Sequence, residues 1–189
     1  MGFWTRLFGL EQEAKGTKTF SDKTPPPQPS ASPHYAPGTR IAYDDHLIER
    51  LLADHRKLLA LFTATRNAFV AGDTAHTTEN LDQFKKEIQA HLLTEEIRLY
   101  VYLENALANN DFNHTMMRNM HKEMASIGHD VLGFLDKYNA LGKNHALSSS
   151  FIADLDQLGK VLIERIQQEE STLYPLYIAP AELGKAHVE

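Results

Sequence analysis

The distribution of proline divides this chain into two unequal parts. Six of the eight prolines lie between Pro25 and Pro37, whereas none lies between Gly38 and Tyr174. Proline removes a backbone hydrogen bond inside a helix, so a stretch of this length without proline permits long helices. The sequence therefore predicts a Pro-rich N-terminal tail followed by a helical domain.

Composition shifts along the chain suggest four segments. We expect a short amphipathic segment over residues 1–10, a Pro/Ser-rich linker over 11–42, a folded domain over 43–178 and a C-terminal tail over 179–189. The first segment has neither the longer hydrophobic region nor the small-residue cleavage site of a signal peptide. Its apolar residues predict a contact with a protein partner, or a weak contact with a membrane surface.

Charge and cysteine content exclude several classes of function. The chain has 19 basic and 25 acidic residues, a formal charge of −6, which argues against a nucleic-acid partner because phosphate binding needs a basic patch. It has no cysteine, so disulfides, thiolate nucleophiles and cysteine-ligated metal sites are excluded. No apolar stretch approaches the roughly 18 residues of a membrane span. These features predict a cytoplasmic protein without a transmembrane segment.

A 3.6-residue period of apolar residues is clear from Asp45 onward. It predicts four helices, at about residues 45–69, 80–107, 116–141 and 151–174. Helices of this length with short connections form an antiparallel up-down-up-down four-helix bundle. We therefore expect an all-α fold.

A few inward positions of these helices are polar. His55 interrupts the apolar stripe of the first helix, His91 and Glu95 interrupt that of the second, and Glu169 interrupts that of the fourth. Because His91 and Glu95 are four residues apart, they lie one turn apart on the same face. Unpaired buried carboxylates are costly, so these glutamates require a cation of some kind.

The second and fourth helices repeat one another at an offset of 74 residues. The segment HLLTEEIRLYVYL aligns with RIQQEESTLYPLY, so that Glu95 matches Glu169 and Tyr100 matches Tyr174. Two such helices that carry inward carboxylates are typical of two-metal sites in bundles. Imidazole and carboxylate ligands without thiolate favour iron or manganese, with zinc as an alternative.

These residues resemble the hemerythrin-like HHE cation-binding domain family. The resemblance rests on His55, on His91-x3-Glu95 followed by Glu96 and LY, and on EE with LYP at 169–175. It implies a bundle that holds a non-haem di-iron centre, in proteins that bind oxygen, sense oxygen or redox state, or repair iron centres. It also implies that His55, His91, Glu95 and Glu169 are ligands.

Two positions depart from the family pattern. Arg165 stands where the repeat places the partner of His91, and a guanidinium cannot ligate a metal. Arg165 could instead pair with Glu169, four residues later, and satisfy it without metal. The ligand from the third helix is open between His121, the usual choice of the family, and Glu123, which would make the centre richer in carboxylate.

Three functions follow as hypotheses. The first is a non-enzymatic (di-)iron domain that binds or senses oxygen, peroxide or nitric oxide. The second is a carboxylate-rich di-iron or di-manganese oxidase or peroxidase, and the third is a metal-poor regulatory or adaptor bundle. We expect the LY tyrosines mainly to pack at the end of the bundle, although one of them could hydrogen-bond a bound ligand or serve as a metal ligand.

Overall fold

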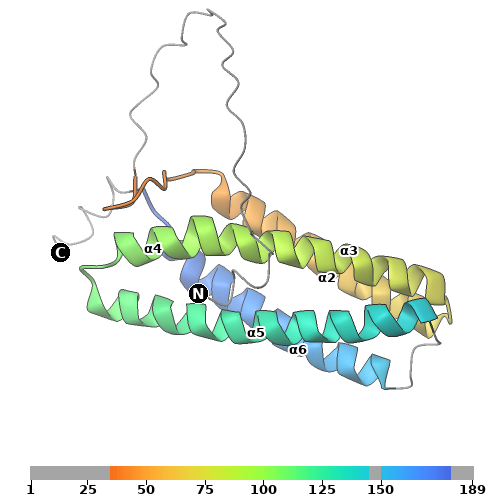
Figure 1. Cartoon of the computed structure of the whole chain (residues 1–189). Coiled ribbons are helices and arrows are strands. Elements are labelled where there is room, and N and C mark those ends of the chain that lie inside the picture. Colours follow the sequence, from red (N-terminus) through yellow and green to blue (C-terminus); the bar gives the residue numbers. More distant parts are fainter. Residues whose placement is uncertain (1–34, 145–149, 180–189) are drawn as a thin grey trace, which may run out of the picture. The chain divides into compact units, whose positions relative to one another are not determined.

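Four helical rods form the folded domain of the computed structural model, which describes residues 35–144 and 150–179. Consecutive rods run in opposite directions (Figure 1). Their elements are α2 (Leu47–Val70), α3 (Thr74–Thr94), η1 (Glu95–Tyr100), α4 (Val101–Ala106), α5 (Asp111–Asn144), α6 (Phe151–Gln168), η2 (Glu169–Leu173) and η3 (Tyr174–Leu176). Both α2 and α5 pack against α3 and α6, which closes the ring of helices. The predicted all-α, antiparallel four-helix bundle is confirmed.

The residues before α2 fold back toward the end of the chain. A tight turn joins Tyr35 to Ala42 through an isolated β-bridge. The ring of Tyr43 then stacks on Tyr177 at 5.0 Å, and the Asp44 N–H donates to the Tyr177 hydroxyl at 2.9 Å. The predicted segment 1–10, most of the linker 11–42 and nearly all of the tail 179–189 lie outside the described residues.

Two helices begin earlier than the apolar period predicted. Helix α3 begins at Thr74 because the Asp73 carboxylate accepts the N–H of His76 at 3.0 Å and caps the helix. Helix α5 begins at Asp111, where the Asn110 side chain accepts the N–H of Asn113 at 3.0 Å. The first turns of both helices are mostly polar and exposed, so they carry no apolar stripe by which the period could reveal them.

Two short π-helical segments interrupt the second and fourth rods at corresponding places. Segment η1 begins at Glu95 and η2 begins at Glu169, the two glutamates that the internal repeat aligns. A π-helix closes hydrogen bonds between residues five apart, and such segments are often found at functional sites. The sequence repeat is thus also a repeat of an unusual backbone geometry.

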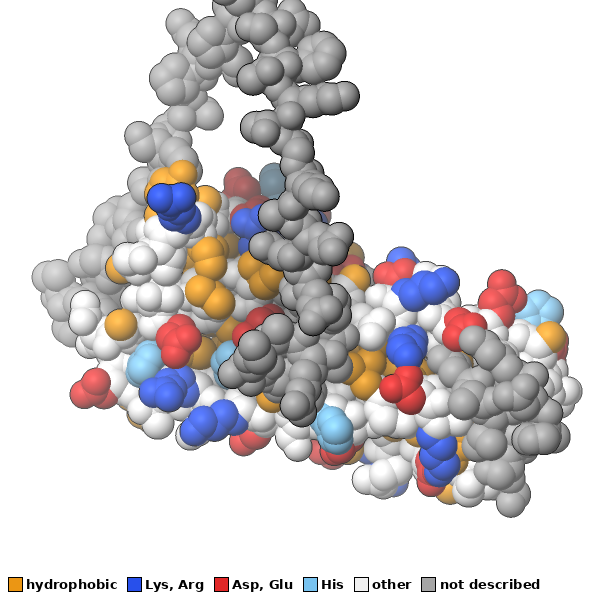
Figure 2. Space-filling model, viewed as in Figure 1, with side chains coloured by type: hydrophobic (Ala, Val, Ile, Leu, Met, Phe, Trp, Pro, Cys, Tyr) orange, Lys and Arg blue, Asp and Glu red, His pale blue; other side chains and the backbone are white. Residues whose placement is uncertain are grey.

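The described surface mixes both signs of charge. On the face shown in Figure 2, acidic and basic side chains alternate over the bundle, which fits the modest net charge of −6. None of the described helices is long and apolar enough to cross a membrane. The core is formed by apolar side chains from all four rods, among them Leu51, Leu92, Met117, Leu135 and Leu155.

Candidate metal centre

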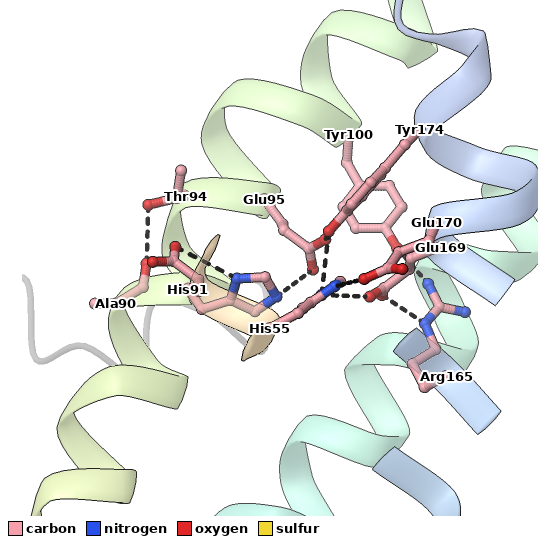
Figure 3. Close-up of polar contacts among 11 residues, drawn as sticks. His55, Ala90, His91, Thr94, Glu95, Tyr100, Arg165, Glu169, Glu170 and Tyr174 are labelled. Carbon is pink, nitrogen blue, oxygen red and sulfur yellow. Dashed lines mark hydrogen bonds and ion pairs between the residues drawn. The ribbon is translucent and has the colours of Figure 1, made fainter. Parts of the chain in front are cut away.

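Four buried side chains from three rods meet in the bundle. His55 comes from α2, His91 from α3, Glu95 from η1 and Glu169 from η2, and each is at most 3% exposed. One potential ligand atom from each of them lies within 4.8 Å of the others. Figure 3 shows the two imidazoles and the two carboxylates pointing toward one another. The four residues that interrupt the apolar stripes are therefore one cluster.

The His55 imidazole is held from both sides. Its Nδ1 lies 2.8 Å from a carboxylate oxygen of Glu170, at the edge of the bundle. Its Nε2 points inward and lies 3.2 Å from Glu169 Oε2 and 3.2 Å from the Tyr174 hydroxyl. The outer hydrogen bond to Glu170 leaves Nε2 to face the cluster, which is the arrangement that orients ligating histidines in metalloproteins.

His91 and Glu95 face each other without a hydrogen bond. Nε2 of His91 lies 3.6 Å from Glu95 Oε2, which is too long for such a bond. Glu95 Oε2 and His91 Nδ1 are both buried and have no hydrogen-bond partner among the described atoms. Asp54 Oδ2 lies 3.7 Å from that Nδ1, close enough to orient the ring after a small shift. Glu95 Oε2 is thus the orphaned atom inside the cluster, and it indicates a missing partner there.

The protonation of the cluster reflects its burial and its negative charge. Burial, together with the charge of Glu169, raises the pKa of Glu95 to about 7. Burial would lower the pKa of His91, but the Glu95 charge and the nearby Asp54 outweigh it and raise that pKa. Burial would likewise raise the pKa of Glu169, yet the hydrogen bond to His55 and the charge of Arg165 lower it. The cluster therefore favours bound positive charge.

Arg165 supplies one such charge next to Glu169. Its guanidinium is 2% exposed, and its Nε donates to Glu169 Oε1 at 2.6 Å. A second nitrogen donates to the Tyr100 hydroxyl. Its Nη1 has no hydrogen-bond partner among the described atoms and lies 4.0 Å from the Glu123 carboxylate. The predicted pairing of Arg165 with Glu169 is thus present.

The two ligand candidates from the third helix lie outside the cluster. His121 Nε2 is 2.6 Å from the Glu96 carboxylate, and its ring stacks on Tyr100. The Glu123 side chain is 60% exposed, and in this region it approaches Arg165 rather than a histidine. Neither residue belongs to the group whose atoms could hold a metal together.

A comparison with protein families adds independent information. The family model of the hemerythrin HHE cation binding domain matches residues 46–177, which is most of the chain and all four rods. This chain belongs to the hemerythrin HHE family. No curated protein and no solved structure matches it.

The residues of this HHE domain fit the cation that the family name implies. Neighbouring donor atoms in the cluster lie 3.2 Å apart between His55 Nε2 and Glu169 Oε2, and 3.6 Å apart between His91 Nε2 and Glu95 Oε2. Ligands about 2.1 Å from one ion, at right angles to each other, lie about 3.0 Å apart. Two imidazoles and two carboxylates suit iron, manganese or zinc. The cluster can therefore hold a metal ion after small shifts.

Two tyrosines that were expected to pack at the bundle end point into the centre of this HHE domain. The Tyr174 hydroxyl donates to Glu95 at 2.9 Å, and the Tyr100 hydroxyl accepts from Arg165. In an α-helix, residues five apart point about 140° away from each other, so helical periodicity places these tyrosines off the inward face. The π turns that begin at Glu95 and Glu169 bring them back to it. Tyr102 and Tyr177, in contrast, pack against each other, with tilted rings whose centroids lie 4.7 Å apart.

A small cavity borders the centre. It measures about 20 Å³ and is lined by His55, His91, Arg165 and Glu169 together with apolar side chains. Such a volume holds about one water-sized molecule. Gly159 shapes its wall, because a Cβ there would lie 2.4 Å from the Phe62 ring. A small ligand could therefore reach the cluster from an apolar pocket.

Proposed function

We propose that this HHE domain binds non-haem iron through His55, His91, Glu95 and Glu169, and that the iron binds or senses oxygen, peroxide or nitric oxide. The observation that carries the proposal is the buried cluster, in which Glu95 Oε2 has no hydrogen-bond partner among the described atoms and faces His91 Nε2. Absence of cysteine from the chain also supports a cytoplasmic location. Manganese or zinc would suit the same donors.

The surrounding residues would prepare the ligands. Glu170 holds the outer nitrogen of His55, so the ring presents Nε2 inward, and Asp54 stands beside the outer nitrogen of His91. Tyr174 donates to one oxygen of Glu95 and leaves the other oxygen unpaired. Bound iron would supply an open coordination position for oxygen, peroxide or nitric oxide, which the side chains alone cannot bind in this way. The apolar cavity would admit small uncharged ligands and restrict water.

One observation favours a second candidate, a metal-poor regulatory bundle. The ion pair between Arg165 and Glu169 satisfies a buried carboxylate without any metal. In that case the domain would act through contacts with partners. The unpaired Glu95 Oε2 supports metal binding over this alternative, because the Arg165 pair does not satisfy it.

The test is iron loading without oxygen, followed by removal of free metal, metal analysis and an absorption spectrum on admission of air. We expect the wild-type chain to retain iron and its spectrum to respond to oxygen and azide. His91→Ala should retain less than a tenth as much iron, because it removes one of four ligands. His129→Ala is the matched control, since His129 is exposed on α5. Equal retention by His91→Ala and wild type would remove His91 from the site.

A further inference from the structure

The centre consists of two halves, and each half is built around a histidine that pairs with a glutamate and stacks on a tyrosine. We call this arrangement of three residues the outer frame. In the first half, His55 pairs with Glu170 at 2.8 Å and its ring stacks on Tyr174 at 5.6 Å. In the second half, His121 pairs with Glu96 at 2.6 Å and stacks on Tyr100 at 4.4 Å.

The internal repeat relates these frames. Glu96 corresponds to Glu170 and Tyr100 to Tyr174, and each pair lies at the offset of 74 residues. Each histidine thus contacts the glutamate and the tyrosine of a π-helical rod that is not its own.

The inner residues of the two halves differ. In the first half, His91 lies four positions before Glu95, and its Nε2 faces Glu95 at 3.6 Å without a hydrogen bond. In the second half, Arg165 lies four positions before Glu169 and so corresponds to His91. It donates to Glu169 at 2.6 Å and also to Tyr100. The first half therefore has an unpaired carboxylate oxygen, Glu95 Oε2, that faces His91, whereas in the second half Glu169 already has a cationic partner.

We propose that the guanidinium of Arg165 stands in for a second metal ion, so that this HHE centre holds one ion. The inference rests on the function proposed above. The ion would lie in the first half, with Glu169 shared between it and Arg165, because Glu169 Oε2 faces His55 while Oε1 faces Arg165.

Charge supports one ion over two. Glu95 and Glu169 are the two carboxylates of the cluster, and Arg165 is buried beside them. With both carboxylates ionised, one divalent ion leaves the group with a net charge of plus one. A second divalent ion would leave it at plus three, in a buried site where such repulsion is poorly screened.

Ligand supply points the same way. Arginine stays protonated and has no lone pair to offer a metal. His121 directs its Nε2 to Glu96 and lies outside the group of four. The second half thus offers one oxygen of Glu169 and the Tyr100 hydroxyl, both of which already bind Arg165. A second ion would have to displace the guanidinium from both.

The experiment counts ions per chain in the full-length protein. Wild type, Arg165→His and Arg165→Lys would be loaded with ferrous iron without oxygen, desalted and analysed for metal and protein. We expect one iron in the wild type and one in Arg165→Lys, which keeps the charge. We expect two irons in Arg165→His, because this variant gives the second half a histidine at the position that corresponds to His91 in the first half.

Electron paramagnetic resonance gives a second measurement that needs no variant. A single ferric ion gives the signal of an isolated high-spin centre, whereas a bridged pair is spin-coupled and silent. Two irons, or a silent ferric centre, in the wild type would overturn the one-ion inference but leave the proposed iron binding intact. One iron in Arg165→His would also overturn it, since Arg165 would then not be what excludes the second ion. No iron in the wild type would overturn both proposals.

Discussion

The two halves of the centre share an outer frame and differ at one inner position. Around His55 and around His121, a glutamate from a π turn holds one ring nitrogen, Nδ1 of His55 and Nε2 of His121, and a tyrosine stacks on the ring. Inside, one half contains His91 and the other contains Arg165. The difference teaches that the same arrangement around a histidine can surround an inner histidine in one half and a buried guanidinium in the other.

The largest expected effect is on the free energy of unfolding of the metal-free protein. It tests whether the Arg165 guanidinium stabilises the buried Glu169 carboxylate in the second half. Arg165→Met leaves Glu169 buried beside Glu95 without its guanidinium partner. Removal of one member of a buried ion pair costs about 3 to 5 kcal/mol in the free energy of unfolding. Urea unfolding of the chain after chelation of metal would measure this loss.

Arg66→Met is the matched control for that prediction. Arg66 also makes a short ion pair, with Asp156 at 2.8 Å, but both side chains are more than 40% exposed. Exposed pairs contribute at most about 1 kcal/mol. Similar losses for the two variants would show that the Arg165 pair adds nothing beyond a surface contact, and the contrast between the halves would lose its energetic basis.

A second prediction compares the two outer glutamates. Glu170→Gln should weaken iron binding by about tenfold or more, because it alters the group that orients His55, a proposed ligand. Glu96→Gln removes the corresponding partner of His121 and should leave iron affinity unchanged. Competition with a chromophoric chelator measures both affinities. Equal weakening by the two variants would mean that both halves bind metal.

The smallest expected effect comes from the protons of the two inner carboxylates. Glu95 has a pKa raised to about 7 by burial and by the charge of Glu169, so below that pH a bound metal must displace a proton. The pKa of Glu169 is lowered, so this carboxylate is already ionised there. Apparent metal affinity should therefore fall by about tenfold per unit or more as pH drops below about 7, and change less steeply above it.

The affinity would be measured between pH 5.5 and 8.5, at constant ionic strength, with a chelator whose own protonation is known. The raised pKa of His91 acts in the same direction, since a protonated imidazole cannot ligate. An affinity that stays constant from pH 6 to 8 would contradict the raised pKa values and would indicate that both groups are ionised for metal binding throughout.

The fold could be predicted from the sequence because the buried positions of each helix recur at helical spacing and are mostly apolar. Apolar residues at helical spacing identified all four rods, and the absence of proline permitted their length. The predicted starts of the second and third helices, at about residues 80 and 116, are later than the observed starts at Thr74 and Asp111. Capping side chains rather than apolar contacts determine these boundaries. Such caps involve a few polar residues, which look the same in a loop and in an exposed first turn.

The candidate site could be predicted as far as the first residue of each π-helical segment. His55, His91, Glu95 and Glu169 were found as polar interruptions of apolar stripes, and the structure places them together. Tyr100 and Tyr174 were expected mainly to pack at the end of the bundle, with one of them as a candidate at the centre, because a helical period does not include the change of angle that a π turn introduces. Asp54, beside His91, gave no signal except its position next to His55.

The residues around the proposed ion come from distant parts of the chain. His55 and Glu170 alone are separated by 115 positions, and the cluster draws on three of the four rods. An ion held there closes a long loop and binds only the folded state, so it restrains the chain against unfolding. Loss of the ion would let the rods open more often and expose them to proteases. We therefore expect the lifetime of this protein in the cell to follow the supply of its metal.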